Sequence, residues 1–424
     1  MTYQETLAHI YGLGRFGMKP GLERITTLLQ ALDNPHEQTK TIHVAGTNGK
    51  GSTAAFISSI MVAAGYKVGL YTSPHLSRFT ERIRINGLEI EEGEVVRLAE
   101  RVLAVAPVSA TFFEIVTALA WLHFADQGVE LAVMEAGMGG RFDATNAASG
   151  IMSVITPVSP DHCEYLGNTL TEIAFEKAGV VKPGRPLVTA TQSDEVLAVI
   201  GSQCERLASP LFVSGRNFSG SWGDDGLNYQ GLTSGLSGLK PGIGGRYQAE
   251  NAACALAAAE ILGGMGFNLP ETALRKGIEK ATWPGRMEIV GKSPRILLDG
   301  AHNAAGGAAL AESLQDIPHD RLILVAGVMA DKDAEGILGP LFPLTDRAYA
   351  VSPRLERALP SERLAALCRS RRVPCTDAGT IAAGIDEAKN SAGPDDLILV
   401  CGSLFTVGEA RAILYGEHFE PFRG

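Results

Sequence analysis

One short segment indicates the architecture of the N-terminal part of the chain: residues 41–53 read Thr41-Ile42-His43-Val44-Ala45-Gly46-Thr47-Asn48-Gly49-Lys50-Gly51-Ser52-Thr53. Its apolar, β-branched start predicts a strand that is buried on both faces. The glycine-rich centre predicts a tight turn, and residues 53–64 predict a helix whose apolar residues share one face, with Gly65 as its C-cap. A strand, a glycine-rich loop and a helix in this order are typical of a phosphate-binding loop.

The residues of this loop fit the binding of a nucleotide. Backbone N–H groups of a glycine-rich turn can surround phosphate oxygens, Lys50 reaches the outer phosphates, and Ser52 or Thr53 can face a magnesium ion. The spacing differs from the common P-loop, because Val44 stands at the first glycine position and Gly51 separates Lys50 from Ser52. The alternative is an ordinary turn with a solvated lysine, and the order of strand, loop and helix favours nucleotide binding. The candidate ATP-binding residues in the loop are Asn48, Gly49, Lys50, Gly51 and Ser52.

Short apolar runs and Ala-rich helical stretches alternate along the rest of the chain, and this pattern predicts an α/β fold. Strands are expected at residues 41–45, 131–134, 151–155, 186–189, 295–298, 322–325 and 397–400. We expect a P-loop-type, mostly parallel sheet in an N-terminal domain (1–285) and a smaller Rossmann-like α/β C-terminal domain (286–424). The turn-rich Trp283-Pro284-Gly285-Arg286 joins them. The Gly- and Ser-rich stretch from Ser214 to Gly245 predicts a small β-rich insertion or a loop.

Composition excludes several classes of function. The 424 residues carry a net charge of −10 without a basic block, which argues against a nucleic-acid partner. The chain begins without a leader-like segment, and no apolar stretch reaches membrane-spanning length, so we expect no membrane partner. The six cysteines are scattered without a CxxC pair, which argues against structural zinc and disulfides and favours a reducing compartment. We therefore expect a cytoplasmic protein, and a monomer.

Several separate blocks of sequence resemble the folylpolyglutamate synthase and dihydrofolate synthase family, a branch of the Mur-ligase superfamily. The blocks are Phe16–Ile25, His43–Ser52, Thr72–Leu76, Glu81–Ile83, Glu135–Asn146, Asp161–His162, Glu176–Gly179, Trp283–Arg286, Leu298–Asn303 and Gly402–Phe405. The resemblance implies an ATP-dependent ligase that joins L-glutamate to dihydropteroate, to a reduced folate (poly)glutamate, or to both. In that reaction ATP phosphorylates the substrate carboxylate, and the amino group of glutamate displaces phosphate from the acyl phosphate. The resemblance makes Lys50, Lys177 and His302 the candidate catalytic residues.

The resemblance also implies a magnesium site formed by Ser73, Glu135 and His162. Each of the three lies after an apolar strand, and Glu135 is placed at the carboxyl edge of a parallel sheet, where ligands bind in open α/β folds. Without the resemblance, Glu135 is equally a solvated loop carboxylate, His162 a turn or core histidine, and Ser73 part of a Ser-Pro turn. Lys177 resembles a lysine that the family carbamylates; its alternatives are a phosphate-facing cation and a solvated helix residue.

Three further residues, Asn251, Arg286 and Asp299, contact ATP by the same resemblance. Asn can read adenine, Arg can clamp phosphate, and Asp299 can accept from a ribose hydroxyl. From the residues alone, Asn251 is a helix-surface residue and Arg286 a linker charge, and His302 fits a turn as well as a place near the γ-phosphate. These residues lie beyond the N-terminal sheet, so ATP is expected between two domains whose closure completes the site.

Two segments are the candidate site for the pterin. They are Thr111, Phe112, Phe113 and Glu114 at the start of a helix, and Phe142, Asp143 and Ala144. Adjacent aromatic rings can stack on a flat pterin, and Glu114 can accept from its amino groups; the alternative is that the rings face the core. Tyr247 departs from the family, which frequently has histidine there. Two rival functions stay open: another Mur-type ligase acting on a cell-wall precursor, and a non-catalytic nucleotide-binding module.

Overall fold

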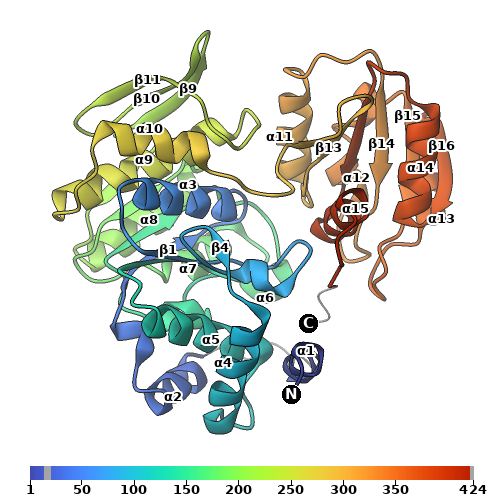
Figure 1. Cartoon of the computed structure of the whole chain (residues 1–424). Coiled ribbons are helices and arrows are strands. Elements are labelled where there is room, and N and C mark those ends of the chain that lie inside the picture. The colour runs from blue at the N-terminus through green and yellow to red at the C-terminus, as the bar shows by residue number, and fades with distance from the viewer. Residues whose placement is uncertain (14–20, 421–424) are drawn as a thin grey trace.

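The protein folds into two α/β bodies, each built on its own sheet (Figure 1). The computed structural model describes residues 1–13 and 21–420. Of the family-like block Phe16–Ile25, residues 16–20 lie outside the described residues. Within the described residues, no helix combines the length and apolar composition needed to cross a membrane.

The N-terminal body contains an eight-stranded, mostly parallel sheet in the order β4-β3-β2-β5-β1-β6-β7-β8. Its strands are β1 (Lys40–Ala45), β2 (Val68–Tyr71), β3 (Ile83–Ile85), β4 (Leu88–Glu89), β5 (Leu131–Glu135), β6 (Met152–Ile155), β7 (Leu187–Thr189) and β8 (Leu211–Val213). Only the β2–β3 and β3–β4 pairs are antiparallel among the strand pairs described for this sheet. β5 and β6 are fully buried and β1 is buried from Thr41 onward, which confirms the strands predicted from continuous apolar runs.

Helices cover both faces of this sheet. They are α1 (Tyr3–Gly12), α2 (Glu23–Ala31), α3 (Lys50–Ala63), α4 (Glu92–Val105), α5 (Phe112–Asp126), α6 (Cys163–Leu166), α7 (Leu170–Ala178), α8 (Asp194–Arg206), α9 (Gln248–Gly264) and α10 (Glu271–Lys280), with short 3₁₀ turns at Pro35–Glu37, Phe79–Arg82 and Ala144–Ala147. One apolar cluster joins α3 and α9 to the sheet, and a second joins α1, α2, α4 and α5 to its other face. Both are the packed layers expected of an α/β domain.

The segment from Ser214 to Gly245 forms a small antiparallel sheet, which confirms the β-rich insertion. Its strands are β9 (Ser219–Gly223), β10 (Gly226–Gln230) and β11 (Gly235–Leu239), in the order β11-β10-β9. Leu227, Tyr229 and Leu236 turn inward and join the apolar cluster of α9. The insertion therefore covers α9 on the side away from the large sheet (Figure 1).

The C-terminal body is a smaller six-stranded sheet in the order β12-β13-β17-β14-β15-β16. Its elements are β12 (Glu288–Val290), β13 (Arg295–Leu298), α11 (Ala304–Leu314), β14 (Leu322–Ala326), α12 (Ala334–Leu338), the 3₁₀ turn Phe342–Leu344, β15 (Arg347–Val351), α13 (Ser361–Ser370), β16 (Cys375–Gly379), α14 (Ile381–Ser391), β17 (Leu397–Cys401) and α15 (Leu404–Tyr415). All strands except β12 pair in parallel, and helices cover both faces. This arrangement agrees with the expected second α/β domain.

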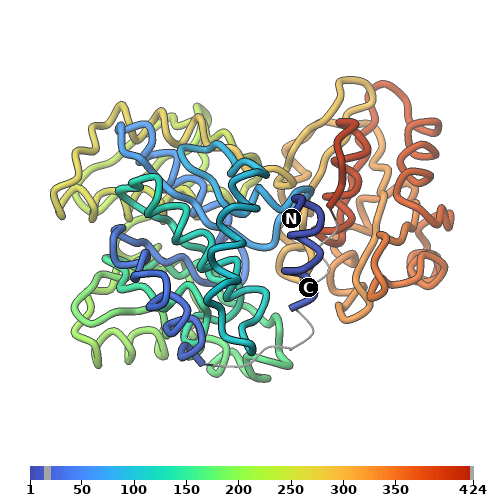
Figure 2. The backbone as a smooth tube through the Cα atoms, turned by 60° about the horizontal axis from the view of Figure 1, so that its bottom comes forward, coloured from blue at the N-terminus to red at the C-terminus, as the bar shows by residue number. Residues whose placement is uncertain are grey.

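The two bodies meet along the side where the phosphate-binding loop lies. Figure 2 shows α1 between them. Tyr3 on α1 donates a hydrogen bond from its hydroxyl to Glu420 Oε2 (3.2 Å), so the start of α1 contacts the last described residue of the smaller body. The loops after β1 and β6 contact loops of the smaller body through Asn48 and Asp161, as a site between domains requires.

Candidate active site

The phosphate-binding loop turns sharply between β1 and α3. The helix begins at Lys50, three residues before the predicted start, because Gly49 takes the N-cap position with a left-handed backbone (φ +85°). A Cβ on Gly49 would lie 2.3 Å from Asn251 Oδ1, so only glycine fits this close approach. Lys50 folds back and donates from Nζ to the carbonyl of Thr47 (3.1 Å). The loop thus places its backbone amides and one ammonium group at the end of β1.

Ser73 and Glu135 lie next to each other at the edge of the same sheet. The Ser73 amide donates to Glu135 Oε2 at 3.2 Å, and Glu135 is 5 % exposed. Glu135 is the last residue of β5 instead of the first residue after it, because Val44 pairs with it in register. Burial raises the pKa of the Glu135 carboxyl, while Lys50, the Ser73 amide and Arg286 partly offset that increase.

A small cavity at the junction of the two bodies is lined by Ser73, by Glu135 and by part of the phosphate-binding segment. Its volume is about 60 Å³, and Gly51, Ser73, Glu135, Trp283 and Arg286 are among the residues that line it. A buried carboxylate beside such a cavity is stabilised by a cation, and magnesium prefers oxygen ligands. The position of Glu135 and Ser73 therefore fits the predicted magnesium site.

His162 lies in the same electrostatic environment, although it does not line this cavity. Its backbone is left-handed (φ 52°), and its amide donates to Asp161 Oδ1 at 2.9 Å. Burial lowers the pKa of His162 to about 4; Asp161 opposes this shift, and Lys332, Lys50 and Lys177 add to it. A neutral imidazole is the form that binds a metal ion.

Within residues 1–13 and 21–420, no three His, Cys, Asp or Glu side chains gather closely enough to hold a metal ion by themselves. The predicted set does not require such a cluster, because the Ser73 hydroxyl is one of its members. Magnesium also keeps water and nucleotide phosphate oxygens among its ligands. The ligand roles of Ser73, Glu135 and His162 stay predictions.

Lys177 is buried beside the phosphate-binding loop. It lies in the last turn of α7, is 4 % exposed, and donates from Nζ to the carbonyl of Gly46 at 2.7 Å. Burial, and secondarily the positive charge of Lys50, lowers the pKa of Lys177 from 10.5 to about 7. The interpretation as a solvated helix residue is therefore wrong. A large share of neutral amine is present near neutral pH, as carbamylation by carbon dioxide requires.

The predicted nucleotide residues beyond the first sheet lie at the junction of the two bodies. Asp299, at the end of β13, accepts from the Tyr247 hydroxyl (2.9 Å) and from the amides of Met287 (3.0 Å) and Ala301 (2.9 Å). Arg286 packs so tightly on Gly300 that a Cβ there would lie 2.1 Å from Arg286 Nη1. Arg286 is thus fixed at the cavity and is more than a linker charge.

Asn251 contacts the loop directly. It is 4 % exposed, its Oδ1 accepts from Thr53 Oγ1 at 3.4 Å, and its amide donates to Gln248 Oε1 at 2.9 Å. Gln248 in turn donates to the Ser52 hydroxyl at 3.2 Å. The interpretation of Asn251 as a helix-surface residue is therefore wrong, because α9 is packed against the start of α3.

Two asparagines join the loop to the smaller body. Asn48 Nδ2 donates to Asn303 Oδ1 (3.1 Å), and Asn303 Nδ2 donates to Asn48 Oδ1 (2.9 Å). Asn303 is also the N-cap of α11, where its side chain accepts from the Gly306 amide. His302, next to it, contacts the carbonyl of Gly300 through Nδ1 at 2.9 Å. His302 therefore lies at the junction, close to the loop.

The first pterin segment begins α5 and is mostly occupied by structural contacts. Thr111 and Glu114 form a capping box, and Glu114 pairs with Arg24 at 3.0 Å. Phe112 is buried and stacks on Tyr11 with ring centroids 5.4 Å apart, so the core interpretation is correct for this ring. Phe113 is only half-buried and leaves surface for a ligand.

The second pterin segment offers one exposed ring and one buried acid. Phe142 is 42 % exposed and lies under the Arg141 guanidinium, 4.2 Å from ring centroid to Cζ. Asp143 is buried and accepts from the Met138 amide (2.9 Å) and from Thr145, and Ala144 is buried in the core. Burial raises the pKa of the Asp143 carboxyl, and its hydrogen bonds partly offset this. Pterin binding by either segment stays a prediction.

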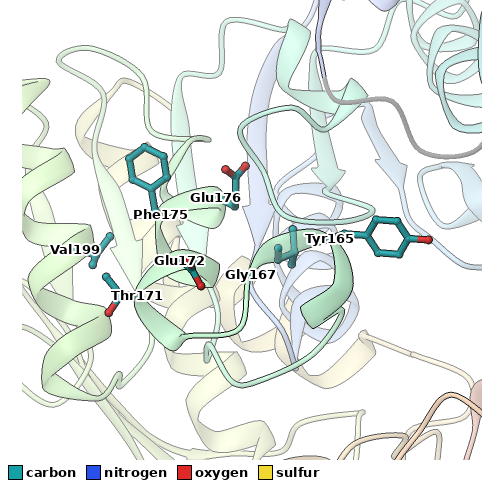
Figure 3. Close-up of a pocket in the computed structure, with 8 residues that line it drawn as sticks. Tyr165, Gly167, Thr171, Glu172, Phe175, Glu176 and Val199 are labelled. Carbon is teal, nitrogen blue, oxygen red and sulfur yellow. The ribbon is translucent and has the colours of Figure 1, made fainter.

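A larger cavity of about 460 Å³ lies elsewhere, against α6, α7 and α8 (Figure 3). Tyr165, Phe175 and Glu176 are among its lining residues. Figure 3 shows Phe175 and Val199 on one side and Tyr165 pointing away from them. None of the predicted ATP or metal residues lines it, so the candidate site is the smaller, more polar cavity beside the loop.

Some residues that the fold brings to this junction were not predicted from the sequence. Lys332, after β14, donates from Nζ to Asp161 Oδ1 at 2.7 Å, beside His162. A signal was present, because Asp331-Lys332-Asp333 follows a buried strand just as Ser73 does. The pairing of Asn48 with Asn303 had no local signal.

Comparisons with known proteins give the class first. Residues 44–259 match the Mur ligase middle domain, and residues 285–404 match the Mur ligase glutamate ligase domain. The first match alone spans more than half of the 424 residues. With a phosphate-binding loop, a buried acid beside it and a second α/β body across the site, the chain is a Mur-type ATP-dependent ligase.

Full-length relatives place the chain in one family within this class of ligases. A dihydrofolate synthase/folylpolyglutamate synthase from Bacillus subtilis is 36% identical over 426 residues, which cover 96% of this chain and 98% of the relative. The structure of Escherichia coli FolC in complex with DHPP and ADP matches with a TM-score of 0.91 and 31% identity, covering 98% of both chains. The chain belongs to the folylpolyglutamate synthase/dihydrofolate synthase family.

Two other comparisons bear on cofactors and length. A folylpolyglutamate synthase/dihydrofolate synthase from Yersinia pestis, complexed with AMPPNP and a Mn ion, matches with a TM-score of 0.89 and 31% identity over 98% of both chains. A probable bifunctional folylpolyglutamate synthase/dihydropteroate synthase from Halobacterium salinarum is 36% identical over 97% of this chain. The chain spans only 51% of that longer relative.

Proposed function

We propose that this protein joins L-glutamate to dihydropteroate, to a reduced folate (poly)glutamate, or to both, through an acyl phosphate. One observation carries the proposal: the buried Glu135 carboxylate, bonded to the Ser73 amide, lines one cavity with Gly51 of the loop and with Arg286. Arg286 at the cavity and Lys50, whose charge also acts on Glu135, supply the cations that transfer of a phosphoryl group to a carboxylate needs.

In the proposed reaction, the substrate carboxylate attacks the γ-phosphorus of ATP, and the bond to the ADP oxygen breaks. The amino group of glutamate then attacks the acyl carbon, and phosphate leaves. Lys50 and the loop amides hold the phosphates, and Arg286 adds positive charge at the wall of the cavity. His302 lies near the γ-phosphate in this proposal.

We propose Ser73, Glu135 and His162 as the magnesium ligands. When bound, the ion neutralises charge that develops on the transferred phosphoryl group. The buried Glu135 carboxylate supports this assignment because a nearby cation would stabilise its charge, and the lowered pKa of His162 supports it because the neutral imidazole has a lone pair for a metal ion.

We propose that Lys177 carries a carbamate. The lowered pKa of its amine, about 7, supports this, because the neutral amine can attack carbon dioxide with loss of a proton. The product is an anion beside Lys50, so it would orient that cation. Mass spectrometry under native conditions, with carbon dioxide supplied, tests the modification as a gain of one CO₂ that acid removes.

We propose that ATP lies between the domains, in contact with Asn251, Arg286 and Asp299. The domain boundary is proposed at residues 285 and 286, where the linker enters the cavity wall. Phe113, Phe142 and Asp143 are the proposed contacts for the pterin. Phe112 lies in the core and supports Thr111 and Glu114 in the first segment. Ala144, also in the core, holds the second segment in place.

We also propose a cytoplasmic monomer that binds neither nucleic acid nor membrane. The six cysteines are free thiols, which supports a reducing compartment. Size-exclusion chromatography with light scattering tests the monomer.

The function is tested by ADP release with dihydropteroate and with a reduced folate, each with and without glutamate. We expect ADP only when a pterin acid and glutamate are both present, together with a product heavier by one glutamate residue. Turnover of a cell-wall precursor instead would assign the rival ligase function. Tight ATP binding without turnover on either pterin would indicate the non-catalytic module.

A further inference from the structure

The carboxylate of Asp161 connects the two bodies at the edge of the candidate site. Its Oδ1 accepts from Lys332 Nζ (2.7 Å) and from the His162 amide (2.9 Å). Its Oδ2 lies 3.8 Å from the Nε2 atoms of both His162 and His302. The side chain is only 8 % exposed. One buried carboxylate therefore holds groups from the large sheet and from two loops of the small sheet.

The bond from the His162 amide matters because of the local backbone. His162 has φ 52° and ψ 37°, a left-handed conformation that is unfavourable for a residue with a Cβ. His162 is the N-cap of the short helix α6, but its own side chain makes no capping hydrogen bond to that helix. The carboxylate of Asp161 is thus the group that satisfies this amide and fixes the direction in which the imidazole leaves the chain.

Lys332 reaches Asp161 from a well-fixed turn. After β14, Met329 bridges Ala358, the Ala330 amide donates to the carbonyl of Arg357 (2.9 Å), and the Lys332 amide donates to Met329 (3.1 Å). The Lys332 side chain is 20 % exposed, so this ion pair is weakly screened compared with one at the surface. Lys332 is therefore held in place by its own turn and forms a defined ion pair across the junction.

We propose that Lys332 is a positioning residue: by holding Asp161, it fixes the backbone of His162 and so completes the cation site only when the small body is docked against the large one. The inference rests on the proposed role of His162 as a metal ligand. Groups that orient a metal ligand typically change metal affinity or activity about 10- to 100-fold when they are removed.

Cation binding then depends on the small body, although none of the proposed metal ligands belongs to that body. The reciprocal pair of Asn48 and Asn303 docks the loop to the same body. Docking therefore adjusts the two sides of the phosphate site together, the loop through Asn48 and the histidine through Asp161.

The experiment measures Mn²⁺ binding to the full chain by electron paramagnetic resonance, in the presence of a non-hydrolysable ATP analogue. We expect Lys332→Met to raise the Kd for Mn²⁺ about tenfold or more, and Lys332→Arg to recover it to within about threefold of the wild-type value. Thermal denaturation shows whether both variants are folded. If Lys332 only stabilised the fold, the Mn²⁺ affinity of the two variants would follow their Tm values. Recovery of the affinity in Lys332→Arg, while both variants have the same Tm, would therefore exclude a role in stability alone.

The matched control is Asp316→Asn, which breaks another ion pair across the junction. Arg246 Nε lies 2.6 Å from Asp316 Oδ2, and both side chains are more exposed than the Asp161 pair. If Lys332 acts only by holding the bodies together, Asp316→Asn should weaken Mn²⁺ binding as well. We expect it to leave the Kd unchanged, and an equal effect of both variants would overturn the positioning role.

A His162→Ala variant separates the two proposals. If it leaves the Kd for Mn²⁺ unchanged, the metal role of His162 is wrong, and the role of Lys332 falls with it. If His162→Ala weakens binding while Lys332→Met binds Mn²⁺ like the wild type, the metal role stands and the positioning role of Lys332 is overturned.

Discussion

Replacing Lys177 by methionine removes a buried amine whose pKa is about 7, compared with 10.5 when it is unperturbed. Between these two values the unfolded chain binds a proton that the folded chain does not. The wild type therefore becomes more stable as the pH rises through this window, and below about pH 7 both states are protonated and this dependence vanishes. The methionine variant lacks this group, so its stability lacks this contribution at every pH.

The size of this change in the free energy of unfolding follows from the lowered pKa of Lys177. A difference of one bound proton between the unfolded and folded states changes the free energy by about 1.4 kcal/mol per pH unit. Near pH 7 the change per pH unit is smaller, because the folded state is still half-protonated there. From pH 7 to pH 9, the free energy of unfolding of the wild type should rise by about 2 kcal/mol relative to Lys177→Met. Loss of the bond to the Gly46 carbonyl adds a constant offset that does not change with pH.

The assay is urea unfolding of both proteins between pH 6 and pH 9.5, in buffers freed of carbon dioxide so that no carbamate forms. Tryptophan fluorescence is a suitable probe, because Trp121, Trp222 and Trp283 all precede Arg286 and report on the part that contains Lys177. A difference between the two proteins that stays flat from pH 7 to pH 9 would refute the lowered pKa, and with it the chemical basis for carbamylation.

Three other substitutions test the site. Glu135→Gln should reduce glutamate-dependent ADP release by at least about 100-fold, whereas its Tm should equal or exceed that of the wild type, because burial disfavours the carboxylate; a large drop in Tm would contradict this. Lys50→Ala should abolish ligation with the fold intact by circular dichroism, and surviving ligation would remove Lys50 from the mechanism. Gly49→Ala should lower stability by about 1–2 kcal/mol from the left-handed backbone alone and should weaken ADP binding, measured by calorimetry, because the added Cβ displaces Asn251; unchanged binding would show that Asn251 does not contact the nucleotide.

Local features of the site could be predicted from the sequence. The strand at residues 41–45, the turn after it and the helix ending before Gly65 are each encoded by neighbouring residues, and the structure has β1, the loop and α3 there, with Gly65 at φ +93°. Ser73 and Glu135 could be placed together because parallel strands end at one edge of a sheet. Their amide–carboxylate bond agrees with that expectation.

Contacts between distant segments could not be predicted in this way. Lys332 and Asp161 are 171 positions apart, and Asn48 and Asn303 are 255 positions apart. Such pairs depend on how the two bodies dock, which no local periodicity encodes. The burial of Phe112 was ambiguous for a different reason: an aromatic ring at the start of a helix has the same sequence pattern whether it faces a ligand or the core.

Glu420 forms a second attachment between the small body and the large one. Glu420 is anchored on the large body by the amide of Phe79 (2.8 Å), the hydroxyl of Tyr3 (3.2 Å) and a bond from its own amide to Ser77 (2.8 Å), and its carbonyl contacts His75 (3.0 Å). The described part of the small body is therefore attached to the large body at its first and its last residues, through residues 283–286 and through Glu420. Once the contacts of Asn48, Asp161 and Arg246 across the junction are broken, these two attachments leave rotation about the line that joins them as the main motion of the small body, and they suppress sliding.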